Sequence, residues 1–450
     1  MKFNSNKIHF LFFFVLFLAC PVLLFALPFS DIPESADCRL QLVSDWFQKD
    51  ITEVLNKPSE FIENECGQKF LVRVEDISTD TLLKAKIIIA PCVQMEGKII
   101  EEDDTQSVSF ETWPEKGAGS WVLYRGEDSN QDTIRIYFQN NEQVYLQIKP
   151  FGTRTHAELV IFGTKVVTNV TVGLPFENMY TLSLHQIYEI TKKLIPWQYV
   201  FIPDGRYEGN EQMISIIRKD LPSIIYTKDA AYDEKGNPVF ASTGKVREVT
   251  DNEKVLTLGS LGFVKWIADG LIEPIIGSGC LIEPLHTPTV IPNNGSLAAT
   301  VLQDFNIYES LDWIRNLAAA TVSARYNNTS LRYDNSGVGV NKLEMPNCPY
   351  ISKTGYKTDC ITALLYVLAT TEPDLFYFGA IAEKMPGNKD LHIYKKAVAI
   401  FPYFTVDGKF NVVVFENGME YTLVQFIKDN PSTYIDLVRV KSSLKFIPRL

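Results

Sequence analysis

Histidine is scarce in this sequence, with five residues among 450. No HExxH motif occurs, and no two histidines stand four residues apart, the spacing that puts two imidazoles on one helix face for zinc. A GxSxG hydrolase motif is also absent. The glycines of Gly277–Gly279 lack both the GK[ST] ending and the GxGxxG spacing of a phosphate loop. The sequence therefore predicts no metal site and no cofactor.

Basic residues are outnumbered, with 43 lysines and arginines against 54 acidic residues, a formal net charge of −11. A chain with this charge is a poor ligand for polyanions. We therefore expect no nucleic-acid partner, and contact with a membrane only through the N-terminus.

The seven cysteines form no CxxC motif, and their spacing is irregular. This excludes a zinc ribbon and a small disulfide scaffold. It leaves single disulfides possible, because an exported protein meets an oxidising compartment.

One long hydrophobic run is present, from Ile8 to Leu27, and Lys2 and Lys7 precede it. A positive segment followed by an apolar one is typical of a secretory signal, so residues 1–26 are predicted to be a signal peptide. A lipoprotein signal that ends at Cys20 is the alternative. Both predict an exported protein, periplasmic or membrane-anchored at the cell envelope.

The hydrophobic pattern divides the remaining chain into three parts. Residues 35–180 begin with a helical pattern and continue with alternating apolar and polar residues, which predicts an antiparallel β-rich domain. Residues 181–295 form a mixed helical segment that ends in a proline-rich linker, where we expect a domain boundary. Residues 296–450 are predicted to be an α+β domain with helices on one face of an antiparallel sheet. The fold class is therefore α+β.

Smaller features fill in this outline. The turn chemistry of residues 233–238 separates two short extended runs. The apolar stretch 261–272 contains two charges and is too short to span a bilayer, so it is predicted to be a buried helix or one lying on an interface. The acidic residues 101–104 lack the spacing of a calcium loop and are predicted to be a solvated loop.

In the C-terminal part, helices are predicted at 307–325, from Cys360 onward, and from Pro373 to Lys384. Thr358 or Asp359 can cap the second of these helices. Two strand patterns, at 397–404 and 410–415, flank Asp407-Gly408, which predicts a hairpin. A last strand is expected from Tyr434 to Val440.

Cys360 is the candidate nucleophile. A thiol in the first turn of a helix experiences the positive end of the helix dipole, which lowers its pKa. His392 follows near a strand and would act as the base. Asp407 and Asn411, beside or on the hairpin, are candidates to orient the imidazole, as is Glu416.

This order resembles NlpC-type, papain-like cysteine peptidases and amidases that act on cell-wall peptides. That family places its nucleophile in an Asp-Cys-Ser-Gly motif at the start of a helix and its histidine at the start of a strand. Here Asp359-Cys360 is followed by Ile361 and Thr362. The resemblance implies that Cys360 is the nucleophile and His392 the base, with Asp407 or Asn411 as the third residue.

A second interpretation needs no catalysis. Cys348 lies twelve residues before Cys360, and a disulfide between them would remove the nucleophile. The protein would then be a binding or structural envelope protein whose partner is a cell-wall peptide or another envelope protein. The residues alone leave both interpretations open.

Overall fold

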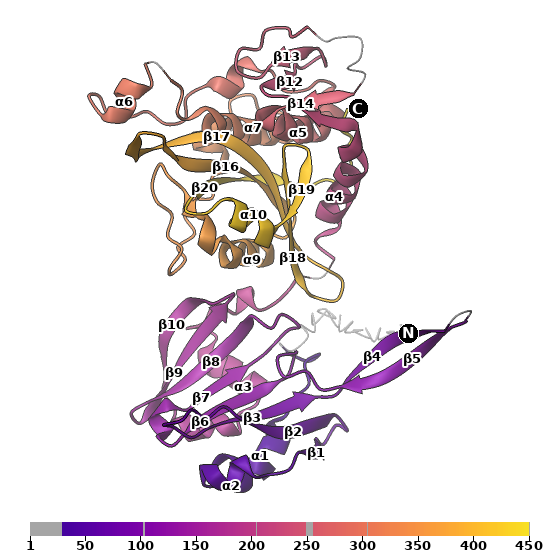
Figure 1. Ribbon diagram of the computed structural model, residues 1–450, viewed down its shortest axis with the longest axis vertical. Coiled ribbons are helices and arrows are strands. Elements are labelled where there is room, and N and C mark those ends of the chain that lie inside the picture. Colours follow the sequence, from indigo (N-terminus) through magenta and orange to yellow (C-terminus); the bar gives the residue numbers. More distant parts are fainter. Residues whose placement is uncertain (1–28, 102–103, 204, 249–254, 304, 450) are drawn as a thin grey trace, which may run out of the picture.

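The structure, a computed structural model, describes residues 29–101, 104–203, 205–248, 255–303 and 305–449. The predicted signal peptide, including Cys20, lies outside these residues. Two β-sheets form the centres of two bodies that lie one above the other in Figure 1. The α+β fold class is confirmed.

The N-terminal body is built on an eight-stranded antiparallel sheet in the order β1-β2-β3-β6-β7-β8-β9-β10. Neighbours in the chain are neighbours in the sheet, apart from one excursion between β3 and β6. The strands are β1 Glu60–Glu63, β2 Lys69–Asp76, β3 Lys84–Pro91, β6 Trp121–Gly126, β7 Thr133–Ile136, β8 Val144–Phe151, β9 Arg154–Ile161 and β10 Thr164–Val172. The excursion is a separate hairpin made by β4 (Val93–Glu101) and β5 (Asp104–Thr112).

One face of this sheet carries the core, because alternate residues of each strand point to it. The side chains of Ile87, Trp121 and Leu146 are almost completely buried there. They lie in one hydrophobic cluster with side chains of the predicted N-terminal helix. In the structure this predicted helix is divided into α1 (Ala36–Leu42), a π-helical turn (Val43–Phe47) and α2 (Ile51–Leu55).

The N-terminal body extends further along the chain than expected. The buried guanidinium of Arg39 donates to the carbonyls of Tyr180 and Leu182, just before α3 (Leu184–Thr191). Trp197 then packs on Phe138 of the sheet domain. These contacts place residues up to about 200 in the N-terminal body.

The rest of the predicted middle segment belongs to the C-terminal body, so the expected boundary in the proline-rich stretch before residue 296 is wrong. The amide of Asn210 donates to the carbonyls of Leu375 and Pro402, and the hydroxyl of Tyr207 donates to that of Ala369. The elements of this segment are α4 Glu208–Asp220, β11 Ile224–Tyr226, β12 Ala230–Tyr232, β13 Pro238–Phe240, β14 Leu256–Leu258 and α5 Ser260–Ile276. These contacts place the boundary near residues 200–206. The prediction failed because a proline-rich stretch resembles a linker even where it packs on its own domain.

The C-terminal sheet has six strands in the order β15-β20-β16-β17-β18-β19, all antiparallel. The strands are β15 Tyr356–Lys357, β16 Leu375–Met385, β17 Asn388–Phe404, β18 Phe410–Glu416, β19 Met419–Thr422 and β20 Tyr434–Lys441. The hairpin at Asp407-Gly408 and the last strand are found where the sequence predicts them. The helices are α6 Leu297–Val301, α7 Glu309–Tyr326, α8 Tyr333–Ser336, α9 Ile361–Thr371 and α10 Leu423–Asp429.

Helices cover both faces of this sheet, not one as expected. Helices α5 and α7 pack on β16 and β17 from one side, and α9 and α10 lie on the other (Figure 1). Helix α5 is buried from Leu261 to Ile272, as its apolar sequence predicts.

The helix predicted from Pro373 to Lys384 is wrong, since this segment forms strand β16. Residues Phe376 to Ala382 are all buried, because the strand has helices on both of its faces. A strand buried on both sides shows a continuous apolar run without alternation, which periodicity cannot distinguish from a buried helix.

The two bodies meet through the β17–β18 hairpin and α9. The side-chain amide of Asn141 donates to the carbonyl of Gly408 over 2.9 Å, and its oxygen accepts from the backbone N–H of Phe410 over 2.8 Å. The ring of Phe162 packs beside those of Tyr366 and Phe410, with centroids 5.8 and 5.5 Å away. These polar and aromatic contacts join the domains at the end of the sheet around residues 404–410.

Candidate functional site

Cys360 lies at the N-cap of α9, one position before the first helical turn, and no side chain caps this helix end. Neither Thr358 nor Asp359 acts as a cap, because these residues form a 3₁₀ turn with Cys360. Glycine is required just before this turn. Gly355 has φ +102°, and a Cβ there would lie 2.3 Å from the carbonyl oxygen of Ile435.

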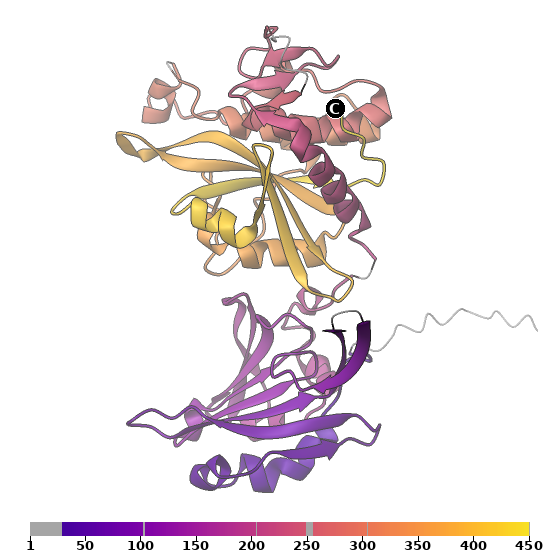
Figure 2. The same cartoon turned by 45° about the vertical axis from the view of Figure 1, so that its right-hand side comes forward.

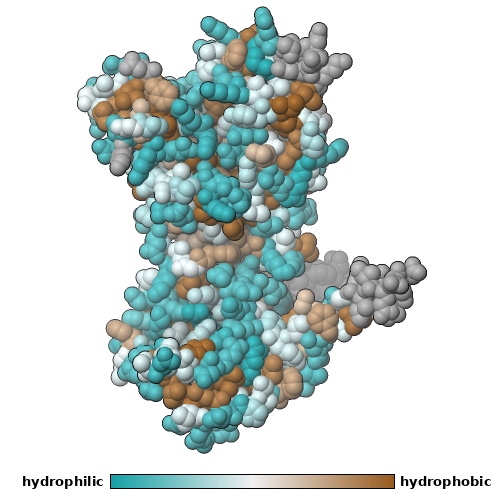
Figure 3. Space-filling model, in the orientation of Figure 1, coloured by the Kyte–Doolittle hydropathy of each residue, from teal (hydrophilic) through white to brown (hydrophobic). Residues whose placement is uncertain are grey.

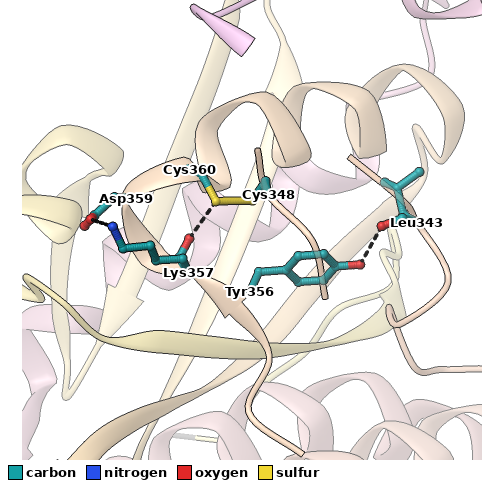
Figure 4. The surroundings of a disulfide bond; sticks show 6 residues. All are labelled: Leu343, Cys348, Tyr356, Lys357, Asp359 and Cys360. Carbon is teal, nitrogen blue, oxygen red and sulfur yellow. Dashed lines mark hydrogen bonds and ion pairs between the residues drawn. A yellow bond between two sulfur atoms is a disulfide. The ribbon is translucent and has the colours of Figure 1, made fainter. Parts of the chain in front are cut away.

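The sulfur of Cys360 is bonded to that of Cys348, with the two Cα atoms 5.6 Å apart (Figure 4). The Cys360 sulfur also lies 3.1 Å from the carbonyl oxygen of Lys357. A half-cystine carries no thiol and forms no thiolate. In this structure Cys360 therefore offers no nucleophile, and the disulfide that the second interpretation of the sequence raises is present.

His392 lies within β17, opposite Lys384 of β16, and not at the start of the strand. Burial, followed by the charge of Lys384, holds the pKa of His392 below its ordinary value, so the ring is neutral at pH 7. Its ring contacts that of Tyr434 at 5.4 Å. Within the described part of the chain its Nε2 atom has no hydrogen-bond partner.

Cys360 and His392 are not paired. Strands β20 and β16 lie between β15, which precedes Cys360, and β17, which carries His392. Three interstrand spacings separate these strands by roughly 14 Å. The aromatic ring that contacts His392 is that of Tyr434, on the intervening strand β20.

The orienting candidates lie at the opposite end of the sheet. Asn411 pairs with Tyr403, eleven residues beyond His392 on β17, and this corresponds to roughly 36 Å along the strand. The carboxylate of Asp407 accepts from the hydroxyl of Thr405 in the hairpin turn. Asp407 and Asn411 therefore orient the β17–β18 hairpin and not an imidazole.

Glu416 is no better placed to orient His392. Its carboxylate accepts from the side chain of Asn417 over 3.5 Å, and burial raises its pKa. The four residues that the resemblance groups as a catalytic set are thus spread over the length of the C-terminal sheet.

A cavity of about 610 Å³ lies elsewhere in the C-terminal body, between the end of α5, the loop 278–287 and the outer face of α7. We call it the α5–α7 pocket. Its size is within the range of small-molecule sites. Its lining comprises Ile272, Ile276, Ser278, Gly279, Cys280, Leu281, Glu283, Pro284, Leu285, Thr287, Asn316, Ala319, Ala320, Ser323, Ala324, Asn327, Thr329, Leu331 and Arg332.

The pocket exists because α7 presents small residues to it. Its α7 lining residues recur at positions i, i+3, i+4, i+7 and i+8 from Asn316, which is the spacing of one helix face. Three of them are alanines, at 319, 320 and 324, and these fill little space. Bulkier residues at the same positions would close the cavity.

Buried polar contacts fix the opposite wall. Asp269 on α5 accepts from the ammonium of Lys265 over 2.5 Å and from the backbone N–H of Cys280 over 2.7 Å. On the other side of the loop, the amide of Asn316 donates to the carbonyls of Leu285 and Thr287. The loop is therefore tied to both helices that enclose the pocket.

The pocket offers no activated nucleophile. Burial, followed by the negative charge of Asp269, raises the pKa of the Cys280 thiol well above its ordinary value, so the thiol stays protonated. Apolar walls dominate the lining, and its charged side chains are Glu283 and Arg332. This arrangement can bind a compact, largely apolar molecule, but it carries no general base next to a nucleophile.

Sequence reasoning does not identify this pocket. The one available signal is the run of alanine, serine and asparagine along one face of the helix at 307–325. A face of small residues is ambiguous, because it equally suits close packing of two helices.

Comparison with known proteins gives one match. Residues 28–199 match the model of a family described as a domain of unknown function (DUF8515). The match covers less than half of the chain and ends where the N-terminal body ends. No curated protein and no solved structure matches.

Among the described residues, no three histidine, cysteine, aspartate or glutamate side chains are grouped so that they could hold a metal ion. No helix within the described ranges is long and apolar enough to cross a membrane.

Proposed function

We propose that this protein is an exported cell-envelope protein that binds its ligand without cleaving it. The observation that carries this proposal is the Cys348–Cys360 disulfide, which occupies the one residue that a cysteine peptidase would need as its nucleophile. Disulfides persist in oxidising compartments, and this fits the predicted signal peptide at residues 1–26.

The α5–α7 pocket is the proposed ligand site. It combines apolar walls with a few polar groups at its edge, the usual composition of a binding site. The guanidinium of Arg332 donates to the carbonyls of Thr329 and Leu331, which fixes its position at the pocket. The ligand class that suits these walls is a compact apolar group with a polar or anionic end, as in the peptide part of a cell-wall fragment.

Binding and cleavage are separated by one experiment with soluble cell-wall peptides. The oxidised protein is titrated by calorimetry, and the peptides are afterwards analysed by mass spectrometry. The expected result is saturable binding with every peptide intact. Cleavage by the oxidised protein, or no binding at all, would contradict the proposal.

A variant locates the site. Ala320→Phe places a phenyl ring in the α5–α7 pocket and is expected to weaken binding at least tenfold. Ala299→Phe on α6, outside the pocket, is the matched control and should bind like the unmodified protein. Equal binding by both variants would place the ligand elsewhere.

Export is tested separately, by fusing residues 1–40 to alkaline phosphatase, which is active only after export. Active enzyme is expected. An inactive fusion would contradict the proposed location while leaving the binding result standing.

A further inference from the structure

The hairpin of β4 and β5, residues 93–112, projects away from the N-terminal body, and we call it the arm (Figures 1 and 2). The two strands pair with each other over nine residue pairs. They form a separate two-stranded sheet and pair with no other strand among the described residues. Both outer edges of the arm are therefore open.

The arm has one apolar face. Residues directly opposite in an antiparallel pair share a face, and here Met95 faces Phe110 while Gly97 faces Val108. The ring of Phe110 lies over Gly97, where a Cβ would meet it at 3.0 Å. Val93, Met95, Val108 and Phe110 are each 37–48% exposed, so the described residues leave much of this face open to solvent.

Apolar surface continues at the base of the arm. Phe61, 69% exposed on β1, packs its ring against that of Trp113, which directly follows β5. Figure 3 shows hydrophobic atoms where the arm leaves the body. Adjoining exposed apolar side chains are typical of an interaction surface, and an isolated two-stranded hairpin is only marginally stable in water without a partner.

The charge of the arm restricts the partner. Residues 93–112 contain six acidic side chains and one lysine. The polar face presents Glu96 and Glu111, and the carboxylate of Glu111 forms an ion pair with the ammonium of Lys69 at 3.8 Å. Such a surface repels an anionic membrane, and it repels a second arm of the same charge. It attracts a basic partner.

We propose that the arm is the docking site for an extended, basic polypeptide segment with alternating apolar residues. The segment adds as a strand to an open edge, where its backbone pairs with the free N–H and C=O groups. Because side chains alternate along a strand, its apolar residues extend the face of Met95 and Phe110, and its basic residues extend the polar face that carries Glu96 and Glu111. This site is independent of the α5–α7 pocket.

Fluorescence anisotropy tests the docking with a labelled ten-residue peptide of alternating lysine and valine. The protein is the full chain without residues 1–26. Saturable binding that weakens with salt is expected, whereas a peptide of alternating glutamate and valine should bind at least tenfold more weakly. Equal binding of the two peptides would overturn the charge argument and with it the proposal.

Two variants locate the binding. Met95→Ser/Phe110→Ser removes the apolar face and should weaken binding at least tenfold, while Ser107→Thr/Ser109→Thr on the polar face should not. Replacing residues 94–111 by two glycines, with the fold checked by circular dichroism, should abolish binding.

Three results would refute the arm as a site for a basic segment. The first is peptide binding that survives deletion of the arm. The second is a dimer of the unmodified protein that dissociates when Met95→Ser/Phe110→Ser is introduced. The third is arm-dependent binding to phosphatidylcholine vesicles in the absence of peptide binding.

Discussion

Reduction of the Cys348–Cys360 disulfide is expected to destabilise the C-terminal body. The bond closes a loop with a sequence separation of 12. The loop-closure entropy removed from an unfolded chain of this loop length corresponds to about 3 kcal/mol at 25 °C. Because reduction breaks the S–S bond, adds one hydrogen atom to each sulfur and leaves every other atom in place, the comparison of oxidised and reduced protein measures the cross-link more directly than a substitution does.

The assay is urea unfolding followed by tryptophan fluorescence, with and without dithiothreitol. The free energy of unfolding should fall by about 3 kcal/mol in the reductant. Cys348→Ala/Cys360→Ala should be destabilised to a similar extent and should no longer respond to dithiothreitol. Cys66→Ser is the control, since Cys66 is an exposed free cysteine, and it should keep the full response.

Two results would refute this reasoning. One is an unchanged unfolding curve in dithiothreitol, although thiol titration shows that the bond is reduced. The other is labelling of both Cys348 and Cys360 in protein that is denatured without reductant.

Three further predictions concern other parts of the chain. Burial raises the pKa of Asp132 to about 6, so its contribution to stability is fully present below about pH 4 and is lost as pH rises through 6. Asp132→Asn should remove roughly 3 kcal/mol of this pH dependence in urea unfolding, and an unchanged slope would contradict it. Gly355→Ala should cost about 2 kcal/mol or more, because its Cβ would overlap the carbonyl of Ile435; a melting temperature equal to that of the unmodified protein would contradict it. Asn141→Ala leaves two backbone groups of the 408–410 turn without their partner and should speed proteolysis between the domains, whereas unchanged cleavage would show that the aromatic contacts suffice.

Much of the fold follows from local sequence signals. The alternation at 133–138 and 144–149 and the Asp407-Gly408 turn predict strands that the structure contains. These signals are strong because one face of each element is buried and the other is not, or because a turn demands particular residues. The apolar stretch 261–272 is likewise found as a buried helix.

The errors arise where burial is two-sided or where contacts are distant in sequence. Strand β16 is covered on both faces, so its sequence shows no period. The domain boundary depends on Asn210 reaching Leu375 and Pro402, more than 160 residues away. A proline-rich stretch gives no indication of such contacts.

The candidate site could be predicted only in part. The spacing of Cys348 and Cys360 permits the disulfide but does not require it. The separation of His392 from Asn411 depends on the length of β17, which runs from Asn388 to Phe404 and so joins His392 and the predicted strand 397–404 in one element. The α5–α7 pocket combines two stretches of the chain, residues 272–287 and 316–332, and its walls form only when the chain folds.

The closure of the C-terminal sheet at β20 has a consequence for self-association. The outer side of this strand is covered by two short pieces of chain. The backbone of residues 338–340 bonds to Leu437 and Arg439, and β15 pairs with Tyr434 and Ile435. The disulfide ties the loop that connects these two pieces to the start of α9. Loss of the bond would loosen both pieces and expose a long, buried strand as an open edge, which is a template for pairing with other chains. The disulfide therefore protects the protein against aggregation as well as against unfolding.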